Sequence, residues 1–396
     1  MEIESLFLLD VLKSFIQEEK LNFDTNIDLS KLLQLTGIHG LTGVLGYVVI
    51  QNPSEKTEGI IQFLKKTSLA SIANSLQRID KANRFVERLN EAGIDHMVFK
   101  GYIVRNYYPV PELRSFGDID ILIKPEAREK CHKLLLELEY DVKTDWEPVY
   151  SYYKEIEYYE LHTELMEIDV SEKADYKGYF KAVWEHTKQV SAHTYEPEPE
   201  FHFIYLLTHI AKHICGSGAG IRMYLDLALF IKHFGNSIDW VYIGKELDNL
   251  KLTGFANMAL TVVERYFCVK SPLPLHKIEE DIFQSFMEYT MAGGVFGHFG
   301  RDSGLISLKN SSRNDDNISR TNTIIRRLFP PAATIESRYT YLQGNHWLLP
   351  VAWVHRILRT REKWDSHTRE MKSIISTDPD EVIKLRKIYQ EIGLGD

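Results

Sequence analysis

Apolar residues recur at three- and four-residue spacing from residue 1 to about 92, which predicts a helical region. The last helix of this region should begin at about Glu58 and end near Gly93, because glycine suits the backbone conformation that closes a helix. Residues 94–99 are rich in apolar residues and are predicted to form a strand. The period of the pattern therefore changes from helix to sheet at about residue 93.

A second strand is predicted where two carboxylates alternate with aliphatic residues after a glycine, in Gly117-Asp118-Ile119-Asp120-Ile121-Leu122. Side chains two apart leave a strand on the same face, so Asp118 and Asp120 point together while the isoleucines face a core. Two carboxylates about 4 Å apart repel by roughly 4 kcal/mol at an effective dielectric constant near 20. A cation removes this repulsion, and carboxylate oxygens select Mg²⁺ or Mn²⁺, the ions that accompany nucleoside triphosphates.

A third carboxylate is expected from the strands that follow a predicted crossover helix at 126–138. Residues 149–160 and 165–170 have strand-like composition and are predicted to be antiparallel neighbours that extend the sheet around Asp118. Glu167 and Asp169 repeat the alternation of carboxylate and aliphatic residue. Either one would complete the set of anionic ligands that a two-metal site requires.

Helical spacing returns at residue 201, with helices predicted at 201–215, at 221–234 and, after a polar loop at 310–322, at about 380–392. The sequence therefore predicts an α+β fold with a small mixed sheet. We divide the chain into a helical region at 1–92, an α/β core at 93–200 and a helical domain at 201–396.

Composition and charge narrow the class of protein. The chain has 396 residues, of which 44% are hydrophobic and 26% charged, as in ordinary globular proteins. Its net charge of −9 argues against long nucleic acid as a partner. Three cysteines without paired spacing fit a reducing compartment, and the sequence contains no basic signal segment or membrane-spanning apolar run. We therefore expect a cytoplasmic protein that does not contact a membrane.

Several segments match one protein family. The motifs of the sheet region are Lys100-Gly101, Tyr107-Tyr108-Pro109, Arg114 and the paired aspartates. Later matches are His209, His213, Gly220, Arg222, Asp226, Arg327-Leu328-Phe329-Pro330 and Leu348-Leu349-Pro350. In these residues the chain resembles the uncharacterised bacterial nucleotidyltransferase family of the DNA polymerase β-like superfamily.

The resemblance implies transfer of a nucleoside monophosphate from a nucleoside triphosphate to a hydroxyl, with release of pyrophosphate. Asp118 and Asp120 would hold Mg²⁺ with a third carboxylate. The family pattern of acidic residue, aliphatic residue and histidine, aligned with Glu167-Ile168-Asp169, assigns that role to Glu167 and keeps Asp169 as the alternative. The residues expected to bind the nucleotide are Lys100, Gly101, Arg114, Gly117, Arg222 and Asp226.

Three alternatives stay open. Arg222 and Asp226 would also suit a buried ion pair between helices. His209 and His213 share one face of a predicted helix and would bind zinc if a third ligand converged, although a structural or substrate-facing role is favoured. The whole chain would also suit a noncatalytic protein that binds a nucleotide or a partner. The acceptor is open among sugars, antibiotics, protein hydroxyls and RNA ends.

Overall fold

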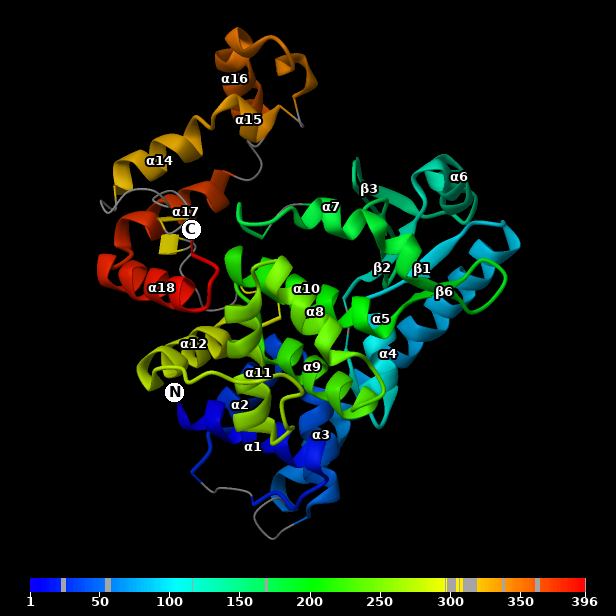
Figure 1. The fold of residues 1–396 in the computed structure, drawn as a ribbon, viewed down its shortest axis with the longest axis vertical. Coiled ribbons are helices and arrows are strands. Elements are labelled where there is room, and N and C mark those ends of the chain that lie inside the picture. The colour runs from blue at the N-terminus through cyan, green and yellow to red at the C-terminus, as the bar shows by residue number, and fades with distance from the viewer. Residues whose placement is uncertain are drawn as a thin grey trace. The chain divides into compact units, whose positions relative to one another are not determined.

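The computed structural model describes residues 1–22, 26–53, 58–115, 117–167, 170–295, 297, 304–305, 307–308, 319–336, 339–359 and 364–395. The chain divides into two compact units, Met1–Gly297 with Ile392–Leu394, and His298–Glu391 with Gly395–Asp396. The predicted regions 1–92 and 93–200 lie in the first unit, and the predicted region 201–396 is divided between the two. Helices and a small mixed sheet make an α+β fold, as predicted (Figure 1).

Helices account for most of the first unit. Their bounds are α1 Ile3–Gln17, α2 Leu29–His39, α3 Thr42–Gln51, α4 Glu58–Glu91, α5 Gly101–Val104, α6 Arg128–Glu137, α7 Tyr176–Lys181, α8 Pro199–Cys215, α9 Ile221–Phe234, α10 Trp240–Asn249, α11 Thr253–Phe267 and α12 Glu280–Gly293. The long helix predicted from Glu58 is confirmed as α4, and the helices predicted at 201–215 and 221–234 are confirmed as α8 and α9.

Five strands form one mixed sheet in the order β1-β2-β5-β4-β3. Their bounds are β1 His96–Val98, β2 Ile119–Ile123, β3 Asp141–Trp146, β4 Val149–Lys154 and β5 Glu157–His162. β2 runs antiparallel to β1 and parallel to β5, whereas β4 is antiparallel to both β3 and β5. The second strand in this order, β2, therefore has a parallel neighbour on one side only.

Two predictions about this sheet are wrong. Residues 149–160 form two strands, because the chain turns at Glu155, whose φ of 54° lies in the left-handed region. Residues 165–167 and 170 are not in a strand, and β5 is the strand that pairs with β2 from this part of the chain. The physical reason is burial: Tyr159 and Leu161 of β5 are fully buried in the core, so β5 supplies the apolar face that this position requires.

The core beneath the sheet contains the predicted face of β2. Ile119, Ile121 and Ile123 pack in one cluster with side chains of α4, α6 and the neighbouring strands. Phe85 of α4 stacks on Tyr159 with ring centroids 4.6 Å apart. With this face of β2 in the core, Asp120 is directed to the opposite face of the sheet.

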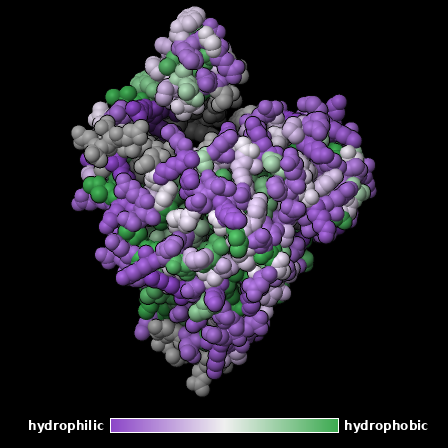
Figure 2. Space-filling model, viewed as in Figure 1, coloured by the Kyte–Doolittle hydropathy of each residue, from purple (hydrophilic) through white to green (hydrophobic). Residues whose placement is uncertain are grey.

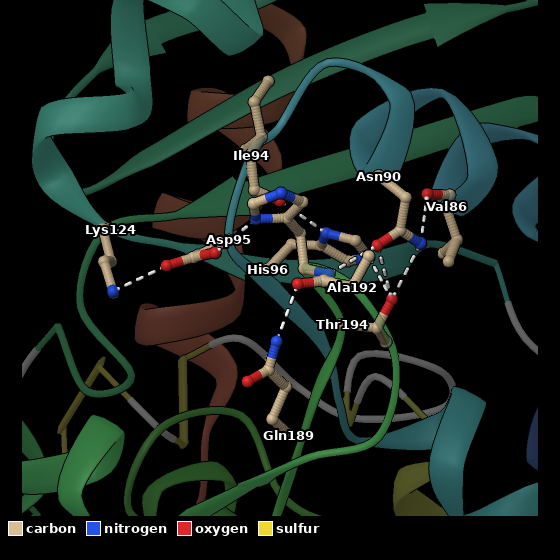
Figure 3. Close-up of polar contacts among 10 residues, drawn as sticks. Val86, Asn90, Ile94, Asp95, His96, Lys124, Gln189, Ala192 and Thr194 are labelled. Atoms are coloured by element: carbon tan, nitrogen blue, oxygen red, sulfur yellow. Dashed lines mark hydrogen bonds and ion pairs between the residues drawn. The ribbon is translucent and has the colours of Figure 1, made fainter.

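A hairpin of β6 Thr187–Gln189 and β7 Tyr195–Pro197 lies beside β1. Asp95, just before β1, accepts hydrogen bonds from Lys124 Nζ and from His193 Nδ1, both at 2.7 Å. The Asn90 side chain donates to Thr194 Oγ1 at 2.9 Å (Figure 3). These contacts fix β1 to the hairpin and to the end of α4, and so fix the segment that leads to Lys100.

The second unit contains the helices α14 Arg320–Leu328, α15 Ala332–Ile335, α16 Leu349–Arg359, α17 Trp364–Ser376 and α18 Pro379–Glu391. The last helix was predicted at about 380–392 and is confirmed. Most of the predicted loop at 310–322 lies outside the described residues, and its end belongs to α14.

Figure 2 shows hydrophilic side chains over much of the visible surface, with hydrophobic side chains between them.

Within the described residues, no helix is both long enough and apolar enough to cross a bilayer.

Candidate active site

The parallel pairing of β2 with β5 brings two carboxylates side by side. Asp120 of β2 is the register partner of Glu160 of β5. Neighbouring strands lie about 4.8 Å apart, so the two side chains project from adjacent positions on the same face. Asp118 stands just before β2 and lines the same cavity.

Asp120 is the most strongly paired of these carboxylates. Its Oδ1 accepts hydrogen bonds from Lys100 Nζ at 2.6 Å and from His162 Nε2 at 2.9 Å. Burial alone would raise the pKa of the Asp120 carboxyl, but the charge of Lys100 and the bond from His162 outweigh burial and lower it below its ordinary value. Asp120 is therefore ionised at neutral pH, although its exposed fraction is only 6%.

Lys100 has a strained backbone at the point where it meets Asp120. Its φ is 52° and its ψ is −125°, a conformation that residues other than glycine rarely adopt. Burial would lower the pKa of the Lys100 ammonium, but Asp120 outweighs burial and raises it. Lys100 is thus held as a cation over the carboxylates by an unusual turn.

Gly101 is required by the close approach of Arg114. A Cβ atom at this position would lie 2.1 Å from Arg114 Nη1, far inside contact distance. Arg114 in turn donates to both carboxylate oxygens of Asp226, from Nε at 3.0 Å and from Nη2 at 2.8 Å. Tyr108 also donates to Asp226 at 2.8 Å. The turn at Lys100-Gly101 therefore packs against a buried, bidentate ion pair between Arg114 and Asp226 of α9.

Asp226 pairs with Arg114 rather than with Arg222, so the ion pair between the two α9 residues is not formed. Arg222 Nη1 donates to the backbone oxygen of Ser115 at 2.8 Å and to its Oγ at 3.0 Å. The Nε of Arg222 is buried and has no hydrogen-bond partner. Burial lowers the pKa of Arg222 to about 10, and nearby Arg114 acts in the same direction. Arg222 is therefore a buried cation whose Nε–H can still donate a hydrogen bond to an anion.

These side chains surround one cavity of about 270 Å³. It is lined by Lys100, Gly101, Arg114, Gly117, Asp118, Asp120, Glu160, Glu167, Leu206, His209, Ile210, Lys212, His213, Arg222, Met223, Asp226 and Val295. The structure thus brings nine of the ten predicted site residues into one cavity, and the tenth, Asp169, lies outside the described residues.

Glu160 is the residue that sequence reasoning missed. Burial and the charges of Asp120 and Asp118 raise the pKa of its carboxyl to about 7. The signal was present in the sequence, because Glu160-Leu161-His162 is itself an acidic residue, an aliphatic residue and a histidine. The alignment of this pattern with Glu167-Ile168-Asp169 used a segment that is not a strand in its described residues, whereas Glu160-Leu161-His162 lies in β5.

Glu167 has a different partner. Its Oε1 lies 3.7 Å from Lys212 Nζ of α8, and its side chain is 37% exposed. Burial lowers the pKa of Lys212, and Glu167 opposes this shift. Glu167 therefore lines the cavity from the loop after β5, paired with a lysine of α8.

The donor set near Asp120 fits a divalent cation. Asp120, Glu160 and His162 each offer a ligand atom, and these atoms all lie within 4.8 Å of one another. Burial and the charges of Asp120 and Asp118 raise the pKa of Glu160 although Lys100 acts to lower it, so an added positive charge would be favourable here. Carboxylate oxygens in such a cluster suit Mg²⁺ or Mn²⁺. Among the described residues, His209 and His213 belong to no group of three potential ligands, so the zinc alternative is without support there.

A family model of uncharacterised nucleotidyltransferases matches residues 25–268 of the chain. The chain belongs to this nucleotidyltransferase family. The matched residues include every residue that lines the cavity except Val295. The resemblance noted at 327–330 and 348–350 lies beyond the match. No curated protein and no solved structure matches the chain significantly.

Proposed function

We propose that this member of the nucleotidyltransferase family is a Mg²⁺-dependent enzyme that transfers a nucleoside monophosphate from a nucleoside triphosphate to a hydroxyl and releases pyrophosphate. The observation that carries the proposal is the register of β2 and β5, which pairs Asp120 with Glu160 beside a buried, partly unsatisfied arginine. We also propose that the fold belongs to the DNA polymerase β-like superfamily and that the protein is cytoplasmic.

Asp118, Asp120 and Glu160 would hold the cation, and Glu167 would approach it only if the Lys212 contact opened. When bound, the ion stabilises negative charge on the attacking and leaving oxygens. His162 fixes the orientation of Asp120 through its hydrogen bond. This assignment moves the third ligand from Glu167 to Glu160, and the proposal makes no use of Asp169.

The phosphates are assigned to the cationic side of the cavity. Lys100 and Arg222 supply fixed positive charge there, and Arg114 with Asp226 holds the turn at Gly101 in place. Because these groups are already positioned, little reorganisation is needed when the triphosphate enters. Gly117 also lines the cavity, and its backbone oxygen accepts a hydrogen bond from Arg78 at 2.6 Å.

The test is release of pyrophosphate from ATP, GTP, CTP and UTP with Mg²⁺ and with EDTA. The wild type should release pyrophosphate only with the metal, and Asp120→Asn should reduce the rate by at least about 100-fold. Asp248→Asn, an exposed carboxylate of α10, is the matched control and should behave as wild type. Metal-dependent binding of a triphosphate without turnover would instead favour the noncatalytic alternative.

A further inference from the structure

The proposed function assigns no role to the residues of α8 that line the cavity. These residues are Leu206, His209, Ile210, Lys212 and His213. The phosphate-binding cations Lys100 and Arg222 lie on other elements, before α5 and on α9. A transfer reaction needs a second substrate beside the triphosphate, and α8 is the side that the assignment leaves for it.

His209 and His213 form a pair on this side. They are four residues apart on α8, so their side chains share one helix face. Their ring centroids are 4.5 Å apart at an interplanar angle of 81°, and their Nε2 atoms are 3.1 Å apart. Tyr205, one turn earlier, stacks on His209 with centroids 5.7 Å apart. The stack holds His209 in place beside its partner.

A hydrogen bond between two imidazole nitrogens requires one protonated and one unprotonated nitrogen. The pair therefore offers one donor and one acceptor at a single point on the cavity wall. A hydroxyl group also donates once and accepts at the same oxygen, so it matches this pattern better than a carboxylate or an ammonium group does.

Groups from several elements keep His209 neutral. Burial holds the pKa of His209 well below its ordinary value, and His213 is the next largest cause. Lys100, Lys212 and His162 act in the same direction. A neutral imidazole can accept a proton, whereas an imidazolium cannot.

We propose that the His209–His213 pair binds the acceptor hydroxyl and removes its proton. The hydroxyl takes the place of the bond between the rings: it donates to the unprotonated Nε2 and accepts from the Nε2–H of the other ring. The acceptor oxygen forms a bond to the α-phosphorus while the bond from that phosphorus to pyrophosphate breaks. The proton moves to the accepting Nε2, and pyrophosphate leaves with the bonding electrons. This inference rests on the proposed function.

The test compares His209→Asn and His213→Asn with His276→Asn, an exposed histidine that serves as the control. Pyrophosphate release is measured with Mg²⁺, the triphosphate that wild type uses best, and glycerol as the hydroxyl acceptor. Both variants should lose at least about 100-fold in kcat, the usual range for removal of a general base. Their Kd for the triphosphate, measured by calorimetry, should stay within about twofold of wild type. Added imidazole should restore part of the rate to His209→Ala.

Three other outcomes would contradict the role of the histidine pair. Wild-type turnover that both asparagine variants retain would overturn the role of the pair and leave the proposed function standing. Weaker triphosphate binding in both His209→Asn and His209→Gln would place the nucleotide on α8 and would also overturn it. No release from wild type with any of the four triphosphates would overturn both proposals.

Discussion

Glu160 is partly buried beside Asp120 and Asp118, and the fold is less stable because of it. An acid whose pKa is raised on folding keeps a proton that the unfolded chain has already released. For Glu160 this window runs from its ordinary pKa of 4.5 to about 7. Stability should therefore decrease as the pH rises through this window, in the absence of a divalent cation. This loss of stability is expected for a site whose clustered carboxylates bind a cation.

Glu160→Gln should raise the free energy of unfolding by roughly 1 to 3 kcal/mol at pH 8 without metal, because it removes the buried like charge. The gain should vanish at pH 4, where the wild-type side chain is protonated. Urea unfolding at pH 8 and at pH 4 measures the difference in the free energy of unfolding between the variant and wild type. Glu126→Gln, at an exposed residue before α6, should show no pH-dependent gain, and an equal gain there would refute the assignment to Glu160.

Gly101→Ala should disrupt the turn over Arg114. The added Cβ would lie 2.1 Å from Arg114 Nη1, and that guanidinium cannot move without loosening both of its bonds to Asp226. We expect a loss of about 2 to 4 kcal/mol in stability and at least about tenfold in activity. Gly37→Ala, in α2 with no atom within 4 Å of the new Cβ, should be neutral or slightly stabilising. Thermal unfolding and pyrophosphate release report the two effects.

At the scale of elements, the site depends on which strand lies beside β2. The sequence predicts β2 well, because Asp118 to Ile121 alternate with a period of two and Ile119, Ile121 and Ile123 form a fully apolar face. It also predicts α4, α8 and α9, whose apolar spacing extends over several turns. Strand order and direction are long-range properties, and residues 157–162 and 165–170 offered competing carboxylates. Packing distinguishes them in the structure, since Tyr159 and Leu161 complete the core.

Helix α8 also contains a buried histidine, His202, that affects stability. The Nε2 of His202 has no hydrogen-bond partner, and burial lowers the pKa of this residue to about 3. The unfolded chain binds a proton at His202 below about pH 6.5, whereas the folded chain does not. The contribution of His202 to stability is thus full above pH 6.5 and decreases as the pH falls toward 3.

His202→Leu should therefore make the protein less sensitive to acid. Between pH 6.5 and 5 the variant should lose roughly 2 kcal/mol less stability than wild type, because it has no buried imidazole to protonate. His276→Gln, at an exposed site, should follow the wild-type curve. Urea unfolding across this pH range tests the difference, and parallel curves for wild type and His202→Leu would contradict it.

At the scale of the whole molecule, the chain leaves the first unit and later returns to it. The first unit ends at Gly297 and takes up the chain again at Ile392–Leu394. Ile392 is 1% exposed and Leu394 3%, and the backbone oxygen of Ile392 lies close to Gly254 of α11. These late residues therefore belong to the core that supports α11, although they follow the second unit in sequence.

Ile392→Ala should destabilise the first unit by roughly 2 to 4 kcal/mol, since it removes a buried side chain. Hydrogen exchange should become faster in α11, the helix that contains Gly254. Ile383→Ala, on α18 and 55% exposed, should change stability by less than about 0.5 kcal/mol. Equal effects of the two substitutions on exchange in α11 would show that the returning segment does not support the first unit.

The return of the chain to the first unit also determines what a protease would release. Residues 298–391 of the second unit stand between two segments of the first unit, so a single backbone cut within them creates two fragments with different attachments. The N-terminal part of these residues stays covalently joined at Gly297. The C-terminal fragment is anchored in the first unit through residues 392–394, and the burial of Ile392 and Leu394 decides how long it stays attached.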